Sequence, residues 1–332
     1  MKKLIAYILI ITIMAALASC GSAQGPAQSQ AAARESSGKT AEQGADQSAQ
    51  SSPEQSSGAS SEQGKEDTKP EEPDKPAYDV DGLVIAECEG ARLTIEGVEE
   101  SWTGGVKFNI LCENLTSDKT LMYSIDDTAV NGYMIGSFFA NEVAPGKKAF
   151  EDLSFSSSDL SASGITSCDK VELKLRVYDS NDWSAAPLIE DRFAFYPTGL
   201  SDEEIVIPDR PTAEGEMIVE DNENFDFIIL GAETSSLGGY RLNCYMENKT
   251  DKTLMYTWDE TSVNGFMIDP FWARSVSPGC RLRSDISFSS SKLEENHIET
   301  VEEIEFKLKV YDSENWLGKD RFEKVFTITI SQ

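Results

Sequence analysis

The chain has 332 residues, of which 58 are Asp or Glu and 29 are Lys or Arg, giving a formal net charge of −29. Such an acidic chain repels the phosphate backbone of nucleic acids and anionic lipid headgroups, so we exclude a nucleic-acid-binding protein. The length allows more than one domain.

The N-terminus is typical of an exported protein. Lys2 and Lys3 precede a short apolar run, and small residues then lead to Cys20. A basic start, a short hydrophobic segment and small residues before a cleavage point predict a signal peptide rather than a membrane span. The sequence Leu-Ala-Ser-Cys resembles the lipobox of bacterial lipoproteins. The resemblance implies that residues 1–19 are removed and that Cys20 carries the lipid that anchors the chain.

Residues 20–79 are rich in Ser, Gln, Ala, Gly, Glu and Pro and contain few large apolar side chains. Such a segment cannot bury enough apolar surface to offset the entropy lost on ordering. We therefore expect a disordered stalk that holds the folded part away from the membrane.

The remainder of the chain is duplicated. KTLMYSIDDTAVNGYMI at 119–135 is repeated as KTLMYTWDETSVNGFMI at 252–268, and VELKLRVYDS at 171–180 is repeated as IEFKLKVYDS at 304–313. The repeat is as long as a typical domain and too long for a solenoid unit. We predict two tandem domains, at 80–198 and 214–332, joined by a linker at 199–213.

Both domains are expected to be all-β. Residues 171–178 and 304–311 alternate between apolar and polar side chains, as in a strand with one face in a core. Asn131-Gly132 and Asn264-Gly265 are signals for tight hairpins, because both turn positions need a positive φ. We expect seven to eight strands per copy and one helical turn near Ser158–Ser163 and Ser291–Asn296. Two packed antiparallel sheets, as in an immunoglobulin-like sandwich, are the simplest solution.

The repeated VNG(Y/F)MI and VYDS motifs, together with the lipobox and stalk, resemble uncharacterised lipoproteins of Gram-positive bacteria that carry tandem immunoglobulin-like domains. The resemblance implies a location on the extracellular face of the cytoplasmic membrane. It brings no functional residues with it.

Five cysteines remain after Cys20, and none faces a cysteine in the other copy. A bridge required by the fold should occur in both copies, so we favour free thiols. A bridge between Cys88 and Cys168 is the alternative.

The sequence contains no motif of nucleophilic, metal-dependent or phosphate-binding catalysis, and we predict a protein that is not an enzyme. The one histidine, His297, corresponds to Gly164 and is expected in a solvated loop. Asp126-Asp127 and Asp259-Glu260 are adjacent along expected strands, where neighbours point to opposite faces and are poorly placed for shared acid–base catalysis.

Two loops carry the candidate ligand residues. Oxygen-bearing side chains cluster just after the VYDS strands, and Ca²⁺ would fit them, although the same residue types make ordinary turns. The candidate ion ligands are Asp179, Asp182, Asp312 and Glu314. Aromatic side chains beside them either cover the end of the sandwich or form a candidate surface for sugar rings or cationic peptides: Tyr178, Trp183, Tyr311 and Trp316.

The sequence therefore favours a surface-anchored module that binds or spaces an extracellular protein or a cell-wall component. A pair of carbohydrate-binding modules, assisted or not by calcium, is the alternative. Phe138-Phe139 and Phe271-Trp272, which follow the hairpins, are expected to be half in the core and half exposed.

Overall fold

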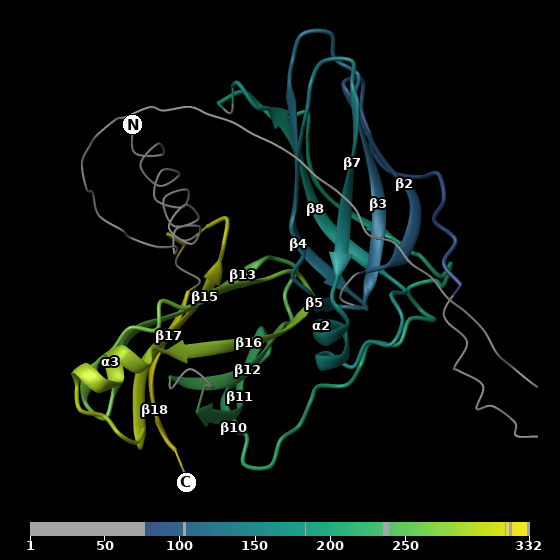
Figure 1. Cartoon of the computed structure of the whole chain (residues 1–332). Helices are drawn as coiled ribbons and strands as arrows, with labels where there is room; N and C mark the ends of the chain where they lie inside the picture. Colours follow the sequence, from purple (N-terminus) through teal and green to yellow (C-terminus); the bar gives the residue numbers. More distant parts are fainter. Residues whose placement is uncertain are drawn as a thin grey trace, which may run out of the picture. The chain divides into compact units, whose positions relative to one another are not determined.

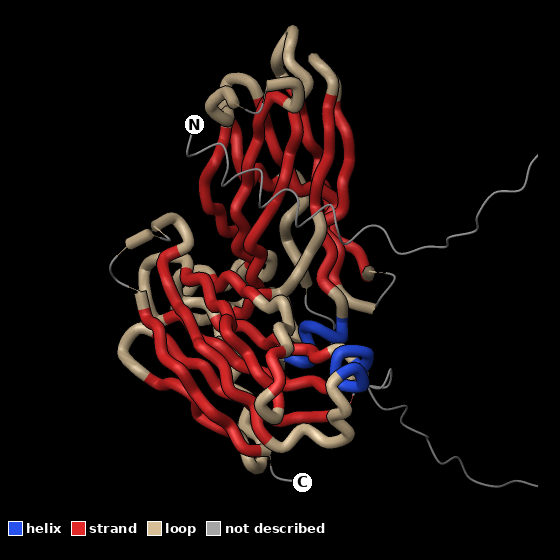
Figure 2. The backbone as a smooth tube through the Cα atoms, turned by 90° about the vertical axis from the view of Figure 1, so that its left-hand side faces the viewer, coloured by secondary structure: helices blue, strands red, loops and turns tan. Residues whose placement is uncertain are grey.

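The structure is a computed structural model of the whole chain, and it describes residues 77–101, 104–182, 184–234, 239–315, 317–318 and 321–330. Cys20, the signal segment and the predicted stalk up to residue 76 lie outside the described residues. Residues 70–332 form one compact unit. Its described part is built from strands, two short helices and the loops between them. Figures 1 and 2 show how they are arranged.

The first copy contains nine strands and one helix among its described residues: β1 (Leu83–Glu87), β2 (Ala91–Glu100), β3 (Val106–Asn114), β4 (Leu121–Val130), β5 (Tyr133–Met134), β6 (Phe139–Val143), β7 (Lys148–Phe155), α2 (Ser157–Ala162), β8 (Val171–Asp179) and β9 (Ile189–Phe195). The second copy repeats the order: β10 (Met217–Asp221), β11 (Phe225–Thr234), β12 (Tyr240–Asn248), β13 (Leu254–Val263), β14 (Phe266–Met267), β15 (Ala273–Val276), β16 (Arg281–Phe288), α3 (Ser290–Glu295), β17 (Glu303–Asp312) and β18 (Phe322–Thr329). The expected count of seven to eight was too low because β5 and β14 are only two residues long.

In each copy two sheets form a sandwich. Strands β1-β2-β3-β7 form one sheet of the first copy, and β5, β4, β8 and β9 with β6 form the other. The second copy pairs β10-β11-β12-β16 and places β14, β13, β17 and β18 with β15. Within each copy neighbouring strands run antiparallel, which confirms the predicted all-β architecture of two immunoglobulin-like sandwiches.

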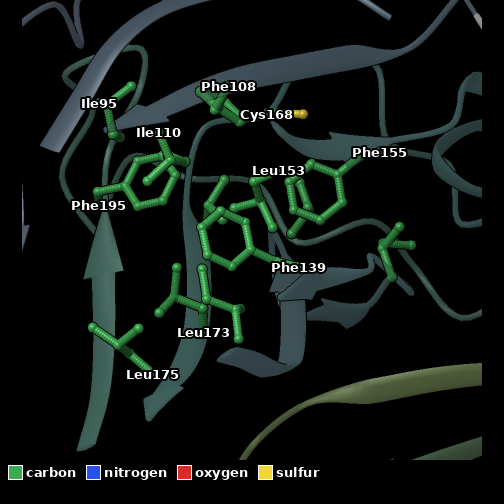
Figure 3. Packing of buried hydrophobic residues seen from close by; sticks show 14 of the residues in the cluster. Ile95, Phe108, Ile110, Phe139, Leu153, Phe155, Cys168, Leu173, Leu175 and Phe195 are labelled. Atoms are coloured by element: carbon green, nitrogen blue, oxygen red, sulfur yellow. The ribbon is translucent and has the colours of Figure 1, made fainter. Parts of the chain in front are cut away.

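The core follows from the alternation in the sequence. Apolar residues of β8 are buried while the polar residues between them are half exposed, and β17 repeats this pattern. Side chains from β2, β3 and β7 meet those of β8 and β9 between the sheets. Figure 3 shows Phe108, Leu153, Leu173 and Phe195 in this apolar layer. Burial of these side chains is the main stabilising contribution to each sandwich.

The predicted hairpins are present. Asn131 and Gly132 have φ of 46° and 78°, and Asn264 and Gly265 have 48° and 81°. The asparagine side chain also fixes the turn to a distant loop, since Asn131 Oδ1 accepts from the backbone N–H groups of Asp169 and Lys170. The two helical turns, α2 and α3, also lie within one residue of their predicted positions.

The acidic pairs Asp126-Asp127 and Asp259-Glu260 were expected in regular strands, but the strands are irregular there. Asp127 and Glu260 have φ of 50°, and the strand register shifts between Asp126 and Ala129 and between Asp259 and Ser262. Each site is therefore a β-bulge, which re-aims the side chain out of the simple alternation. Asp127 forms an ion pair with Arg192 across 3.1 Å, and Glu260 forms one with Lys307.

The two copies are joined through a sheet edge. Strand β5 of the first copy pairs in parallel with β16 of the second, with Tyr133 opposite Arg281. The Arg281 N–H donates to Gly132 O at 2.8 Å. One nine-stranded sheet therefore contains strands of both copies. The expectation of two domains joined by a linker did not include this junction.

The five cysteines of the described chain are free thiols, as favoured from the sequence. Four of them are buried and Cys88 is half-buried. Burial raises the pKa of Cys112, Cys168 and Cys280 to about 12, so these thiols stay protonated at neutral pH.

A search of the described residues for a membrane-crossing helix found none of sufficient length and apolar character.

Candidate functional site

The acidic side chains after β8 and β17 form turns. Asp179 Oδ1 accepts from the Asn181 N–H at 3.0 Å, and Asp312 Oδ1 accepts from the Glu314 N–H at 2.9 Å. Asp182 Oδ1 accepts from both the backbone N–H and the hydroxyl of Ser184, and these bonds lower the pKa of its carboxyl. An aspartate that bonds the backbone two residues ahead is the usual way to stabilise such a turn.

These contacts explain the acidic loop residues without an ion. Asp312 is also paired with Lys252 at 3.6 Å, and Glu314 is exposed. Within the ranges that the structure describes, no three His, Cys, Asp or Glu side chains are grouped so that they could hold a metal ion. Calcium binding at these loops stays a prediction.

The tyrosines of the predicted ligand surface are half-buried, and each has a cation over its ring. The Arg176 guanidinium lies 4.5 Å from the centre of the Tyr178 ring, and that of Arg321 lies 5.7 Å from the centre of the Tyr311 ring. A sugar stacking on the same ring face would have to displace the arginine. Trp183 and Trp316 lie outside the described residues.

His297 is exposed and follows α3, as predicted for a loop histidine. Its φ of 57° matches the φ of 73° at Gly164, its counterpart after α2. His297 therefore serves as the left-handed residue that ends the helical turn, a position that glycine fills more easily.

Two exposed phenylalanines stand out. Phe138 and Phe271 hold equivalent positions in the two copies and are 83% and 94% exposed, while the next residues, Phe139 and Trp272, are buried. This confirms the predicted split between core and solvent. Phe271 also has a φ of 50°, which is rare for a bulky residue. Its N–H donates to Asp269 Oδ1 at 2.7 Å, which holds the turn in place.

A strained backbone that presents an aromatic ring to water contributes little to folding. Burial of a phenylalanine would stabilise the fold by about 2 kcal/mol, and the left-handed conformation costs about 1–2 kcal/mol. Strain of this kind is concentrated at functional positions. The sequence indicated the exposure but not the strain, because no glycine or asparagine marks the turn.

The second site that sequence reasoning missed is the junction between the copies. Tyr133 is fully buried, and its hydroxyl donates to the carbonyl oxygen of Asp209 at 3.1 Å. Arg281 Nη1 donates to Pro208 O at 2.7 Å, and its guanidinium lies 5.8 Å from the centre of the Tyr133 ring. The linker thus contributes acceptors for both side chains.

The outer face of the second copy's sheet supplies the rest of this junction. Ile228, Leu230 and Tyr245 are buried and belong to the same apolar cluster as the first sandwich core. One signal was present in the sequence: residues 227–230 read Phe-Ile-Ile-Leu, an uninterrupted apolar run. Such a run is typical of a strand covered on both faces. The first copy has Leu-Thr-Ile-Glu at the equivalent place.

Comparison with known proteins adds little. No protein-family model matches the chain, and no curated protein matches it. Among solved structures, the chain is similar to an exo-chitosanase from Amycolatopsis orientalis at 8% identity and a TM-score of 0.20. The match covers 73% of this chain and 26% of the enzyme, so the chain spans about a quarter of that protein's length. At this TM-score we draw no conclusion about function.

Proposed function

We propose that this protein is a non-enzymatic lipoprotein, anchored at the outer face of the bacterial cytoplasmic membrane, whose two sandwiches bind an extracellular protein or a cell-wall component. The observation that carries the proposal is the repeated presentation of Phe138 and Phe271. Both copies place an exposed ring directly before a buried aromatic residue, at the entry to strands β6 and β15. Rigid exposed aromatic side chains are the usual anchors of protein interfaces.

Two observations favour a protein or wall partner over a free sugar. The faces of Tyr178 and Tyr311 are occupied by arginines of the same chain. The exposed rings of Phe138 and Phe271 carry no hydroxyl, whereas recognition of a sugar needs polar groups beside the aromatic face.

The binding proposal is tested with the full chain and two preparations of cell wall: intact walls with their proteins, and walls stripped of protein. We expect Phe138→Ala combined with Phe271→Ala to reduce cosedimentation at least tenfold, with an unchanged melting temperature. Val206→Ala, at another exposed apolar position, is the matched control. Binding to intact walls alone indicates a protein partner, and binding to both indicates a wall polymer.

Unchanged wall binding by the double phenylalanine variant would contradict the proposal. The carbohydrate alternative makes a different prediction: binding on a glycan array that is abolished by Trp316→Ala and unaffected by the phenylalanine changes.

Anchoring is tested separately at Cys20. Metabolic labelling with a fatty-acid analogue should mark the wild-type chain, and Cys20→Ser should remove the label and release the chain from the membrane fraction. A label that persists in Cys20→Ser would refute anchoring at this residue.

A further inference from the structure

The junction joins the hairpin of the first copy to the sheet of the second copy. The equivalent hairpin of the second copy and the equivalent sheet of the first copy take no part in it. In the first copy, the hairpin residues Tyr133 and Met134 are covered by the second copy. Their counterparts in the second copy are Phe266 and Met267, which are 47% and 70% exposed. The hairpin that docks in one copy is therefore uncovered in the other.

The sheet face beside the docked hairpin differs between the copies in the opposite sense, because it is covered in the second copy. In the second copy a cross-strand row of Ile218, Ile228, Tyr245 and Arg283 runs over β10, β11, β12 and β16. The middle of this row is buried at the junction, where the linker's Arg210 also lies over the Tyr245 ring. The equivalent row of the first copy is Val84, Thr94, Leu111 and Phe150, in identical register.

Three residues of that row are apolar and its two ends are exposed, while Thr94 in the middle is buried. Phe150 is 64% exposed, Val84 is exposed and Leu111 is half-buried. Strand β7 ends its sheet, with no further strand paired to it in the described chain. Lys148 begins β7 at the position that Arg281 holds in β16. It pairs with Glu113, as Arg281 pairs with Glu247.

We propose that the β14 hairpin of one molecule docks on the β1-β2-β3-β7 face of another, repeating between molecules the junction that β5 and β16 form within one. The backbone bond from Arg281 N–H to Gly132 O becomes a bond from Lys148 N–H to Gly265 O. The Lys148 ammonium then lies over the Phe266 ring, as Arg281 lies over Tyr133. Met267 takes the place of Met134, which packs against the interior cluster of the second sandwich, and Phe150 takes the place of Arg283, which contacts Ala162 of the first copy.

The differences between the copies fit this arrangement. Tyr133 needs an acceptor for its hydroxyl, and the linker supplies it at Asp209. Phe266 has no hydroxyl, so the contact between molecules needs no such acceptor. The two copies of one chain are also joined covalently whereas two molecules are not, so we expect an affinity weaker than that of stable dimers.

The contact joins different surfaces, so it is heterologous and extends head to tail into open chains or rings. After docking, one molecule keeps its free face and the other keeps its free hairpin, so the pair can still extend at both ends. Because the protein is strongly acidic, we expect association to strengthen as salt screens the repulsion between molecules. Self-association requires no external ligand and is independent of the binding function proposed above.

The test uses the full chain in detergent and light scattering that separates protein mass from detergent mass. Wild type should grow from one to several chains as its concentration rises. Met267→Lys blocks the hairpin and Phe150→Glu blocks the face, and each change should raise the dissociation constant at least tenfold. Val206→Lys is the control for an added charge and should associate like wild type.

Mixing the two blocked variants is the decisive step. Phe150→Glu keeps its hairpin and Met267→Lys keeps its face, so an equimolar mixture should form two-chain complexes and stop there. A wild-type chain that stays single up to millimolar concentration would overturn the proposal. So would oligomers that persist in both variants, or a mixture that remains single while wild type associates.

Discussion

Gly164 and His297 occupy equivalent positions in the two copies and share an unusual backbone conformation. Both follow a short helical turn, both have a positive φ, and both donate their N–H to a carbonyl three residues back. Glycine adopts this conformation without a steric penalty, whereas a histidine is strained by its Cβ. The sequence alignment of the copies placed the two residues together, but only the dihedral angles explain the pairing.

We expect His297→Gly to stabilise the second sandwich by about 0.5–1 kcal/mol, because it removes the strain of a non-glycine residue in the left-handed region. The free energy of unfolding in urea measures the gain. Gly164→Ala is the reciprocal change and should destabilise, since the added Cβ would also lie 3.3 Å from Pro208. A His297→Gly chain that is less stable than wild type would show that the histidine ring makes a contact that outweighs the strain.

Alkaline pH should destabilise the fold through its buried thiols. Burial raises the pKa of Cys112 to about 12, while an unfolded thiol titrates near 8.5. Below pH 8.5 the thiol is protonated in both the folded and the unfolded state, and its contribution to the free energy of unfolding is fully present. As pH rises toward 12, only the unfolded state loses its proton, so stability falls by about 1.4 kcal/mol per pH unit for each such thiol. Urea midpoints from pH 8 to 10 should fall less steeply for Cys112→Ala than for wild type, and equal slopes would contradict this account.

At the scale of elements, a buried asparagine ties three strand ends together in each copy. Asn248 Nδ2 donates to the carbonyls of Lys252 and Val276, and its Oδ1 accepts from the N–H and hydroxyl of Thr250. Asn114 repeats these contacts in the first copy. The amide satisfies backbone groups that strand pairing leaves unpaired, and a buried group of this kind is costly to lose.

We expect Asn248→Asp to destabilise by at least about 2 kcal/mol at neutral pH, because a carboxylate would face two carbonyl oxygens that now receive an N–H. The loss should shrink in acid, where a protonated carboxyl donates one hydrogen bond. Urea unfolding at pH 7 and pH 4 measures both effects. Asn181→Asp, at an exposed loop position, is the control and should change stability by less than about 0.5 kcal/mol. A pH-independent loss in Asn248→Asp would rule out this explanation.

Over the whole molecule, the junction between the sandwiches decides whether they unfold together. Tyr133 and Arg281 contact each other and both bond the linker. We expect the wild-type chain to show one calorimetric transition. Tyr133→Ala removes a fully buried side chain at a cost of about 3–5 kcal/mol and should separate this transition into two.

The duplication provides the matched control for this experiment. Phe266→Ala changes the equivalent residue of the second copy, which is 47% exposed, and should leave a single transition in dilute solution. Two transitions in wild type, or a single shifted one in Tyr133→Ala, would show that the junction does not couple the sandwiches.

The sequence by itself determined the sandwiches. Alternation at 171–178 and 304–311 places one side of a strand in the core, and Asn-Gly fixes a two-residue hairpin, because both signals are local and act on neighbouring residues. It also predicted that Phe138-Phe139 and Phe271-Trp272 are half in the core and half exposed, although the structure was needed to show that Phe139 and Trp272 are the buried rings.

Only the tertiary structure decided where the bulges lie, that Phe271 is strained, and that Tyr133 is covered while Phe266 is not. VNGYMI and VNGFMI differ by one residue, yet one docks and the other is exposed. The difference depends on a sheet face and a linker that are distant in sequence. The burial of a side chain depends on which distant segments pack against it. The sequence of the hairpin itself does not specify those segments.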